Sequence, residues 1–209
     1  MVAGERPMCL ECRMTLPVLQ THLDPRENEL VCKLQSRIPL EGAVAYFRYR
    51  REESHAQLLH DAKYRGRPSI GRQLAAEFAA IVEPRGFFDG VDAIVPVPLN
   101  VLKHAARGYN QTYHIARGIA DVHPLPVIDA LSARRHKSQT ARGAEARRQA
   151  VGGIYSARPG ALDGVGHVVL VDDIATTGST IYECLSALHG AWPSLRLSVF
   201  VLASTARSL

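Results

Sequence analysis

The segment at 168–180, VVLVDDIATTGST, constrains the fold of this chain more than any other feature. Its apolar run predicts a strand over 167–171 that is buried on both faces. A short turn leads into a predicted helix over 179–189, and the apolar run at 196–203 predicts another strand. A strand, a helix and a strand at this spacing form a βαβ unit, whose strands run parallel. We therefore expect an α/β fold with a mostly parallel central sheet flanked by helices.

The rest of the chain carries further apolar patterns, some with the spacing of a strand and some with the spacing of a helix. Strands are predicted at 43–49, 93–97 and 126–130, and helices at 54–63, 69–81 and 111–120. The expected caps are Ser69, Asn110 and Gly190. The helical stripes are Ile70, Leu74, Phe78 and Ile81 in one helix, and Ile181, Cys184, Leu185 and Leu188 in another. These stripes predict helices that each bury one face, with Cys184 in the core.

The composition is that of a folded domain of ordinary size. Of 209 residues, 46% are hydrophobic and 22% are charged, which suffices for a packed core. Scattered prolines and the lack of a period predict a loop-rich, cysteine-containing appendage at 1–40, with the main domain at 41–209. No stretch approaches the roughly 18 apolar residues of a membrane span, and residues 1–7 lack the apolar centre of a signal peptide. Four cysteines make no disulfide scaffold, so we expect a cytoplasmic protein.

The strand predicted at 167–171 leads directly into two acids, Asp172 and Asp173. The carboxyl ends of parallel strands are where α/β sheets bind ligands. The N–H groups where a turn opens into a helix can hold a phosphate. The residues of this turn are Ala175, Thr176, Thr177, Gly178, Ser179 and Thr180. A sugar phosphate would use both features, because carboxylates accept hydrogen bonds from its hydroxyl groups. The alternative is that Asp173 only caps the helix.

Positive charge is concentrated in the window 134–149. The window carries the whole net charge of +5, because its only acid is Glu145 and its basic residues are Arg134, Arg135, Lys137, Arg142, Arg147 and Arg148. Such a concentration suits an anionic ligand, either a phosphate or a nucleic-acid backbone, although a charge run is also typical of a solvated loop. The chain contains no Walker loop and no GxGxxG motif, which argues against a nucleoside triphosphatase or a dinucleotide enzyme.

The segment at 168–180 resembles the 5-phosphoribosyl-1-pyrophosphate (PRPP) signature of type I phosphoribosyltransferases. Further segments narrow the resemblance, namely AKYRGR at 62–67, VPVPL at 95–99, RGYNQ at 107–111, SQT at 138–140 followed by Arg147, and GIY at 153–155. In this order they resemble the elements of the competence protein F (ComF, also called GntX-like) family. The resemblance extends over nearly the whole chain from Cys9 onward.

The resemblance implies a type I phosphoribosyltransferase-like domain with a hood built from the N-terminal part of the chain. It implies that Asp172 and Asp173 are the catalytic acids and bind the ribose hydroxyl groups, directly or through Mg²⁺. The turn at 175–180 would bind the 5′-phosphate of PRPP. Arg107 would hold the pyrophosphate, and Arg142 and Arg147 would belong to a flap over the site. The implied reaction is transfer of the phosphoribosyl group to an acceptor that the sequence does not identify.

The cysteines depart from the family pattern. Members of the family usually begin with two CxxC pairs that form a zinc finger, whereas this chain has one pair, Cys9 and Cys12. Either the first pair is absent, or the start lies further upstream. A structural Zn²⁺ takes four ligands, which Cys32 and His22 could complete. The alternative is two exposed thiols and a buried Cys32. Another departure is Ala150, where the family often has Asn.

The family name implies a second role, in DNA uptake. The basic window and aromatic residues interleaved with arginines would suit single-stranded DNA. These aromatic residues are Tyr46, Phe47, Tyr49, Tyr64 and Tyr109. The alternative for them is ordinary packing at a sheet edge. The resemblance thus implies several partners: PRPP, single-stranded DNA, a DNA-uptake or helicase protein, and a second copy of the chain in a homodimer.

Overall fold

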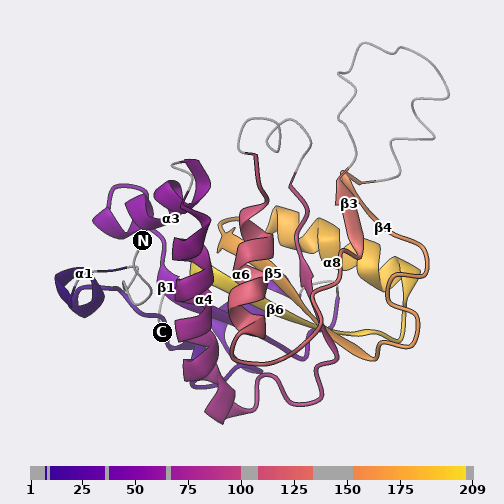
Figure 1. The fold of residues 1–209 in the computed structure, drawn as a ribbon. Helices are drawn as coiled ribbons and strands as arrows, with labels where there is room; N and C mark the ends of the chain where they lie inside the picture. The colour runs from indigo at the N-terminus through magenta and orange to yellow at the C-terminus, as the bar shows by residue number, and fades with distance from the viewer. Residues whose placement is uncertain are drawn as a thin grey trace.

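In the part of the chain that the structure describes, four strands form one parallel sheet (Figure 1). The computed structural model describes Met8 and residues 10–35, 38–64, 67–99, 108–133 and 153–205. The strands of the sheet are β1 (Gly42–Arg48), β2 (Ala93–Pro96), β5 (His167–Ala175) and β6 (Arg196–Ser204). Their order is β1-β6-β5-β2, and every neighbouring pair is parallel. This sheet confirms the predicted α/β fold.

The two central strands are almost wholly buried, as their continuous apolar sequences require. β5 is longer than the predicted strand at 167–171, since it runs to Ala175. Asp172 and Asp173 therefore lie inside the strand and not beyond it. Because successive side chains of a strand point to opposite faces, this correction decides where each acid points.

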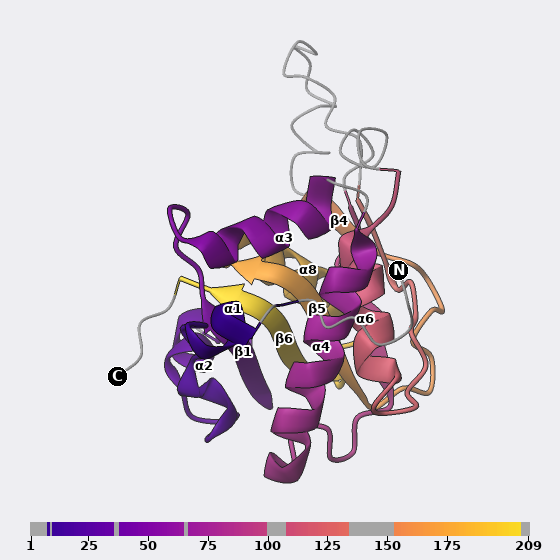
Figure 2. The same ribbon diagram turned by 60° about the vertical axis from the view of Figure 1, so that its left-hand side comes forward.

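Helices cover both faces of the sheet, as Figures 1 and 2 show. On one face lie α3 (Ser54–Tyr64), α4 (Pro68–Val82) and α6 (Gln111–Ala120). On the other lie α2 (Glu29–Leu34) and α8 (Ser179–Ala191). The side chains of β5 divide accordingly, with Val169 and Val171 packed on the first side and Val168 and Leu170 on the second. The result is three layers with a hydrophobic core on each side of the sheet.

The helices α4 and α6 lie in close contact because α6 has a glycine where the two backbones meet. A Cβ atom on Gly118 would stand 2.1 Å from the backbone oxygen of Arg72 and 3.0 Å from Cβ of Ala75. At the edge of the same contact, the Arg72 guanidinium donates to both carboxylate oxygens of Asp121, at 2.6 and 2.7 Å. This pairing lowers the pKa of Asp121 and raises that of Arg72. The contact holds the C-terminal end of α6 against α4.

The N-terminal segment contains short helices, namely α1 (Leu10–Met14), the 3-10 helix η1 (Gln20–His22) and α2. Of these, η1 and α2 pack along β1, and α1 pairs with α4 through Arg13 and Glu77. The Thr21 hydroxyl both accepts from the Ala45 N–H, at 2.8 Å, and donates to the Ala45 carbonyl, at 2.9 Å. Asn28 caps α2 by accepting from the N–H groups of Leu30 and Val31. Leu30 and Leu34 then pack in the same core as α8.

Several predicted details are wrong. Residues 126–130 form no strand, only a single parallel bridge between Val127 and Ile94. A separate antiparallel hairpin pairs β3 (Leu131–Ala133) with β4 (Tyr155–Ala157).

The predicted helix ends also need correction. Arg67 and not Ser69 is the N-cap of α4, and Ile81 is exposed while its neighbour Val82 is buried. Gly190 lies within α8, whose C-cap is Trp192. The short 3-10 helix η2 (Glu83–Arg85) follows α4.

The aromatic residues of β1 belong to the core. Tyr46 and Phe47 are buried, and the Tyr46 ring stacks on Phe78 with centroids 4.8 Å apart. The Tyr46 hydroxyl donates to Glu77 at 2.8 Å. This confirms the packing interpretation for Tyr46 and Phe47, and the nucleic-acid interpretation is wrong for them. In the described part of the chain, no helix combines the length and the apolar character needed to cross a membrane.

Candidate functional site

The site centres on the end of β5 and the turn into α8. Asp172 and Asp173 are only 8% and 7% exposed. The turn continues to Gly178, which is the N-cap of α8 and has a φ of +82°. The backbone angle requires glycine, and a Cβ here would lie 2.8 Å from Cδ2 of Leu34, so a larger residue would also displace that side chain. Since Gly178 occupies the cap position, the alternative in which Asp173 caps α8 is wrong.

The two acids belong to opposite faces of the sheet because they are consecutive residues of one strand. On the α6 side, Nε2 of Gln111 donates to Oδ2 of Asp173 at 3.0 Å. The Asp173 backbone N–H donates to Oδ1 of Asp172 at 2.8 Å. Each carboxylate is thus oriented by a neighbouring donor, and together they present acceptors at the edge of the sheet.

Asp172 lies near α8 and the hairpin. Burial raises the pKa of Tyr155 to about 12, and the negative charges of Asp172 and Glu183 add to the effect. Burial also raises the pKa of the Cys184 thiol, again with Asp172 and Glu183 contributing. Both groups stay protonated at neutral pH. Cys184 is fully buried, as predicted, and the burial that raises its pKa also keeps the thiol away from reagents.

The turn is rich in donors. The Thr177 and Ser179 hydroxyl oxygens are 2.7 Å apart, and the Ser179 N–H reaches the Thr177 hydroxyl at 3.4 Å. Thr176, Thr177, Ser179 and Thr180 are all exposed, whereas Ala175 and Gly178 are buried. A helix start carries N–H groups without intrahelical acceptors and the positive end of the helix dipole. The arrangement therefore suits a phosphate or another small anion.

The start of α6 is fastened to the end of β2. The Asn110 side chain accepts from the Thr112 N–H at 3.2 Å, which confirms Asn110 as the predicted cap. The Thr112 hydroxyl and the Asn110 amide both donate to the Val97 carbonyl, at 2.6 and 3.2 Å. These bonds bring Gln111 to the acid pair. The sequence offered a signal for this residue, since Gln111 closes the RGYNQ segment.

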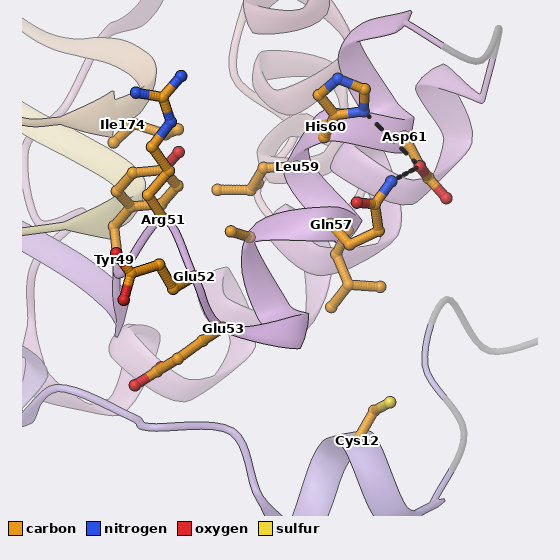
Figure 3. A pocket seen from close by; sticks show the side chains of 12 residues that line it. Cys12, Tyr49, Arg51, Glu52, Glu53, Gln57, Leu59, His60, Asp61 and Ile174 are labelled. Atoms are coloured by element: carbon orange, nitrogen blue, oxygen red, sulfur yellow. Dashed lines mark hydrogen bonds and ion pairs between the residues drawn. The ribbon is translucent and has the colours of Figure 1, made fainter.

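A pocket of about 850 Å³ adjoins the acid pair through Ile174 (Figure 3). In this view Tyr49 and Arg51 lie on one side of the pocket, and Gln57, His60 and Asp61 lie on the α3 side. Gln57 donates to Asp61 at 2.7 Å. Because Ile174 follows Asp173 directly, a molecule in this pocket would lie beside the end of β5.

Some of the predicted site residues lie outside the described residues. They are Arg107, Arg142, Arg147 and Cys9, together with the whole basic window. Their roles stay predictions. Two other cysteines are predicted candidates for zinc ligands. Cys12 is half-buried and Cys32 is exposed, so the expectation of a buried Cys32 is wrong.

The described residues differ in how well they suit Mg²⁺ and Zn²⁺. Within the described ranges, no group of three or more His, Cys, Asp or Glu residues could hold a metal ion. Mg²⁺ needs only one or two carboxylates when phosphate oxygens complete its shell, so Asp172 and Asp173 fit such an ion. Zn²⁺ would need further thiol or imidazole ligands, and His22 instead contacts the Leu19 carbonyl through Nδ1, at 3.1 Å.

Two curated proteins are similar to this chain. Competence protein ComFC of Bacillus subtilis (strain 168) is 20% identical over 211 residues, which cover 95% of this chain and 84% of that protein. Competence protein F of Haemophilus influenzae is 34% identical over 101 residues, which cover 47% of this chain and 44% of that protein. No family model matches the chain. The names of both proteins agree with the family that the sequence motifs indicated.

Two solved structures show a remote likeness. A glutamine PRPP amidotransferase from B. subtilis, complexed with ADP and GMP, is 24% identical with a TM-score of 0.41, over 65% of this chain and 26% of that chain. An allosteric regulatory enzyme of purine biosynthesis is 22% identical with a TM-score of 0.43, over 64% of this chain and 25% of that chain. Likeness at this level says nothing about the ligands of the present chain.

Proposed function

We propose that this chain, which is similar to competence proteins ComFC and F, is a phosphoribosyltransferase-like protein that binds PRPP with Mg²⁺. The observation that supports this most is the meeting of two features at the end of β5. The buried acids Asp172 and Asp173 adjoin a glycine turn that opens a helix. One feature recognises hydroxyl groups and the other recognises phosphate, and a ribose 5-phosphate carries both.

The residues of the site suit transfer at C1 of a ribose. Loss of diphosphate leaves positive charge on the sugar, and fixed carboxylates nearby stabilise such charge. Gln111 orients Asp173 for this, and the turn holds the 5′-phosphate so that the sugar cannot rotate. Mg²⁺, when bound, supplies positive charge to the diphosphate. The acceptor would enter the pocket beside Ile174.

Calorimetric titration with PRPP, with and without Mg²⁺, tests the proposal. Asp173→Asn keeps the shape of the side chain and an acceptor for Gln111 but removes the charge. A hydrogen bond to a charged group contributes about 1.5–3 kcal/mol, so the affinity should fall by about tenfold to a hundredfold. Asp129→Asn is the matched control, because it removes the same charge at an exposed position outside the site.

Two results would contradict the proposal. One is the absence of PRPP binding by wild-type protein whose circular dichroism shows a folded α/β protein. The other is equal affinity in wild type and Asp173→Asn. Mg²⁺-dependent binding that only Asp173→Asn weakens would support it and justify a screen for the acceptor.

A second function is favoured by the basic window at 134–149, which carries the net charge of the chain. It is the binding of single-stranded DNA in DNA uptake, with the same fold and without catalysis. Binding through phosphates falls steeply with salt and shows little sequence preference. Anisotropy of a labelled oligonucleotide at low and moderate salt tests it. If the protein binds DNA but does not bind PRPP, this second function would replace the first proposal.

A further inference from the structure

The N-terminal helix α2 contributes a lysine to the turn of the candidate site. Nζ of Lys33 donates to the backbone oxygen of Thr176 and, at 3.3 Å, to the Thr205 hydroxyl. Thr205 itself donates its hydroxyl to the Thr176 oxygen at 3.0 Å and its N–H to the Ala175 oxygen at 3.1 Å. A cation from a distant part of the chain thus lies against the first residues of the turn.

The next residue of α2 makes an independent contact with the same turn. Leu34 is buried, and its Cδ2 atom occupies the space that a Cβ on Gly178 would need. The C-terminal end of α2 therefore contacts the turn at 175–180 at two points, one polar and one apolar. The capping of α2 by Asn28, which also donates to the Ala43 carbonyl of β1 at 2.9 Å, fixes the helix that carries both contacts.

An anion-binding turn works when its N–H groups face the ligand and its carbonyl groups point away. A carbonyl that turned toward the anion would repel it. The Lys33 ammonium holds the Thr176 carbonyl and places a full positive charge at the first residues of the turn. An ammonium group has three N–H donors, and the bonds to Thr176 and Thr205 use two of them.

We propose that Lys33 is a positioning residue of the phosphate end of this site, and that it strengthens binding through its charge as well as its hydrogen bonds. The inference rests on the proposed function, because it assigns the phosphate of a ribose 5-phosphate unit to the turn. It makes α2, which belongs to the cysteine-containing N-terminal segment, part of the ligand site.

Three variants of Lys33 separate charge from shape. Lys33→Met removes both the charge and the donors, Lys33→Gln keeps a donor without charge, and Lys33→Arg keeps both. The matched control is Arg26→Met, which removes one positive charge from the same N-terminal segment. Arg26 lines a different pocket, beside His167 and Arg196, where β5 and β6 begin. The measurement is calorimetric affinity for ribose 5-phosphate and for PRPP with Mg²⁺.

We expect Lys33→Met and Lys33→Gln to weaken both ligands by about tenfold, the effect of losing one charge-assisted hydrogen bond. Lys33→Arg should recover most of the affinity, and Arg26→Met should bind like wild type. Hydrogen exchange of the ligand-free protein should show faster exchange of the amides at 175–178 in Lys33→Met. Salt should weaken ligand binding less in Lys33→Met than in wild type, because one charge has been removed.

Two outcomes overturn the inference alone, with PRPP still bound by the wild type. One is unchanged affinity in Lys33→Met. The other is an affinity of Lys33→Gln equal to that of Lys33→Arg, which would mean that Lys33 only supports the fold of the turn. If folded wild type binds neither ligand, the proposed function fails and takes this inference with it.

Discussion

Two features favour glycine at position 178, one in the local turn and one in a residue distant along the chain. Its positive φ belongs to the turn, and a Gly within a Thr- and Ser-rich loop predicts such an angle from sequence. Its contact with Leu34 belongs to the tertiary structure, and no local pattern contains it. Glycine is therefore favoured here for two reasons, of which the sequence reveals one.

The variant Gly178→Ala tests both requirements. A left-handed angle costs a non-glycine residue about 1–2 kcal/mol, and overpacking costs about 1–3 kcal/mol more. We expect the free energy of unfolding in urea to fall by about 2–5 kcal/mol, with loss of PRPP binding. Gly164→Ala is the control, because Gly164 has a φ of +81° and no atom within 4 Å of the added Cβ. Equal losses in the two variants would contradict a role for the Leu34 contact.

The limits of sequence-based prediction at the site follow from distance along the chain. Asp172, Asp173 and the turn lie in one continuous segment, and a strand followed by a helix places them without further information. Gln111 reaches Asp173 across 62 residues, and Lys33 reaches Thr176 across 143. Gln111 could be found because it belongs to a motif. Lys33 is a single lysine in a six-residue helix, and nothing in its local sequence indicates a contact with the turn.

Among the elements, the contact between α4 and α6 depends on a glycine in mid-helix. Alanine is normally the better helix former by about 1 kcal/mol, so Gly→Ala in a helix should stabilise it. At Gly118 the sign should reverse, because the added Cβ would meet the Arg72 carbonyl at 2.1 Å. We expect Gly118→Ala to lower the free energy of unfolding by about 1–3 kcal/mol.

Gly190 in α8 provides the opposite case. It is exposed, and a Cβ there would meet nothing within 4 Å. Gly190→Ala should therefore raise the free energy of unfolding, by about 0.5–1 kcal/mol. Urea denaturation of both variants decides the point. If Gly118→Ala also stabilised the protein, the close approach of the two helices would be refuted.

The elements themselves were predictable wherever a period was sustained, and the failure at 126–130 has a clear cause. This segment does approach β2, since the Ile94 N–H donates to the Pro126 carbonyl and the Ile128 N–H donates to the Ile94 carbonyl, both at 2.9 Å. Pro124 and Pro126 have no N–H to extend the ladder. The apolar residues signalled a strand, and the prolines reduced it to one bridge.

On the scale of the whole molecule, the N-terminal segment shares a core with the sheet. Leu30 is fully buried in the cluster that contains Leu185 of α8 and Val199 of β6. We expect Leu30→Ala to lower the free energy of unfolding by about 2–5 kcal/mol. Trp192, the single tryptophan, reports on the far end of α8, where its Nε1 donates to Asp163 at 3.1 Å.

The fluorescence of Trp192 and the far-ultraviolet circular dichroism should shift together in Leu30→Ala, as one transition. Leu23→Ala serves as the control, because Leu23 is 48% exposed and should change stability little. A Trp192 transition at the wild-type midpoint, with circular dichroism alone displaced, would mean that the N-terminal segment unfolds by itself.

The strand order also governs when this molecule can fold during synthesis. β6 is the last strand along the chain, yet it lies between β1 and β5 and pairs with both. The partner of Gly42 in the sheet is Ser198, so β1 leaves the ribosome long before its neighbour exists. The Thr205 bonds to Ala175 and Thr176 come later still. A nascent chain therefore holds an unpaired strand edge for most of its translation, and the turn of the candidate site gains its Thr205 bonds only with the last strand.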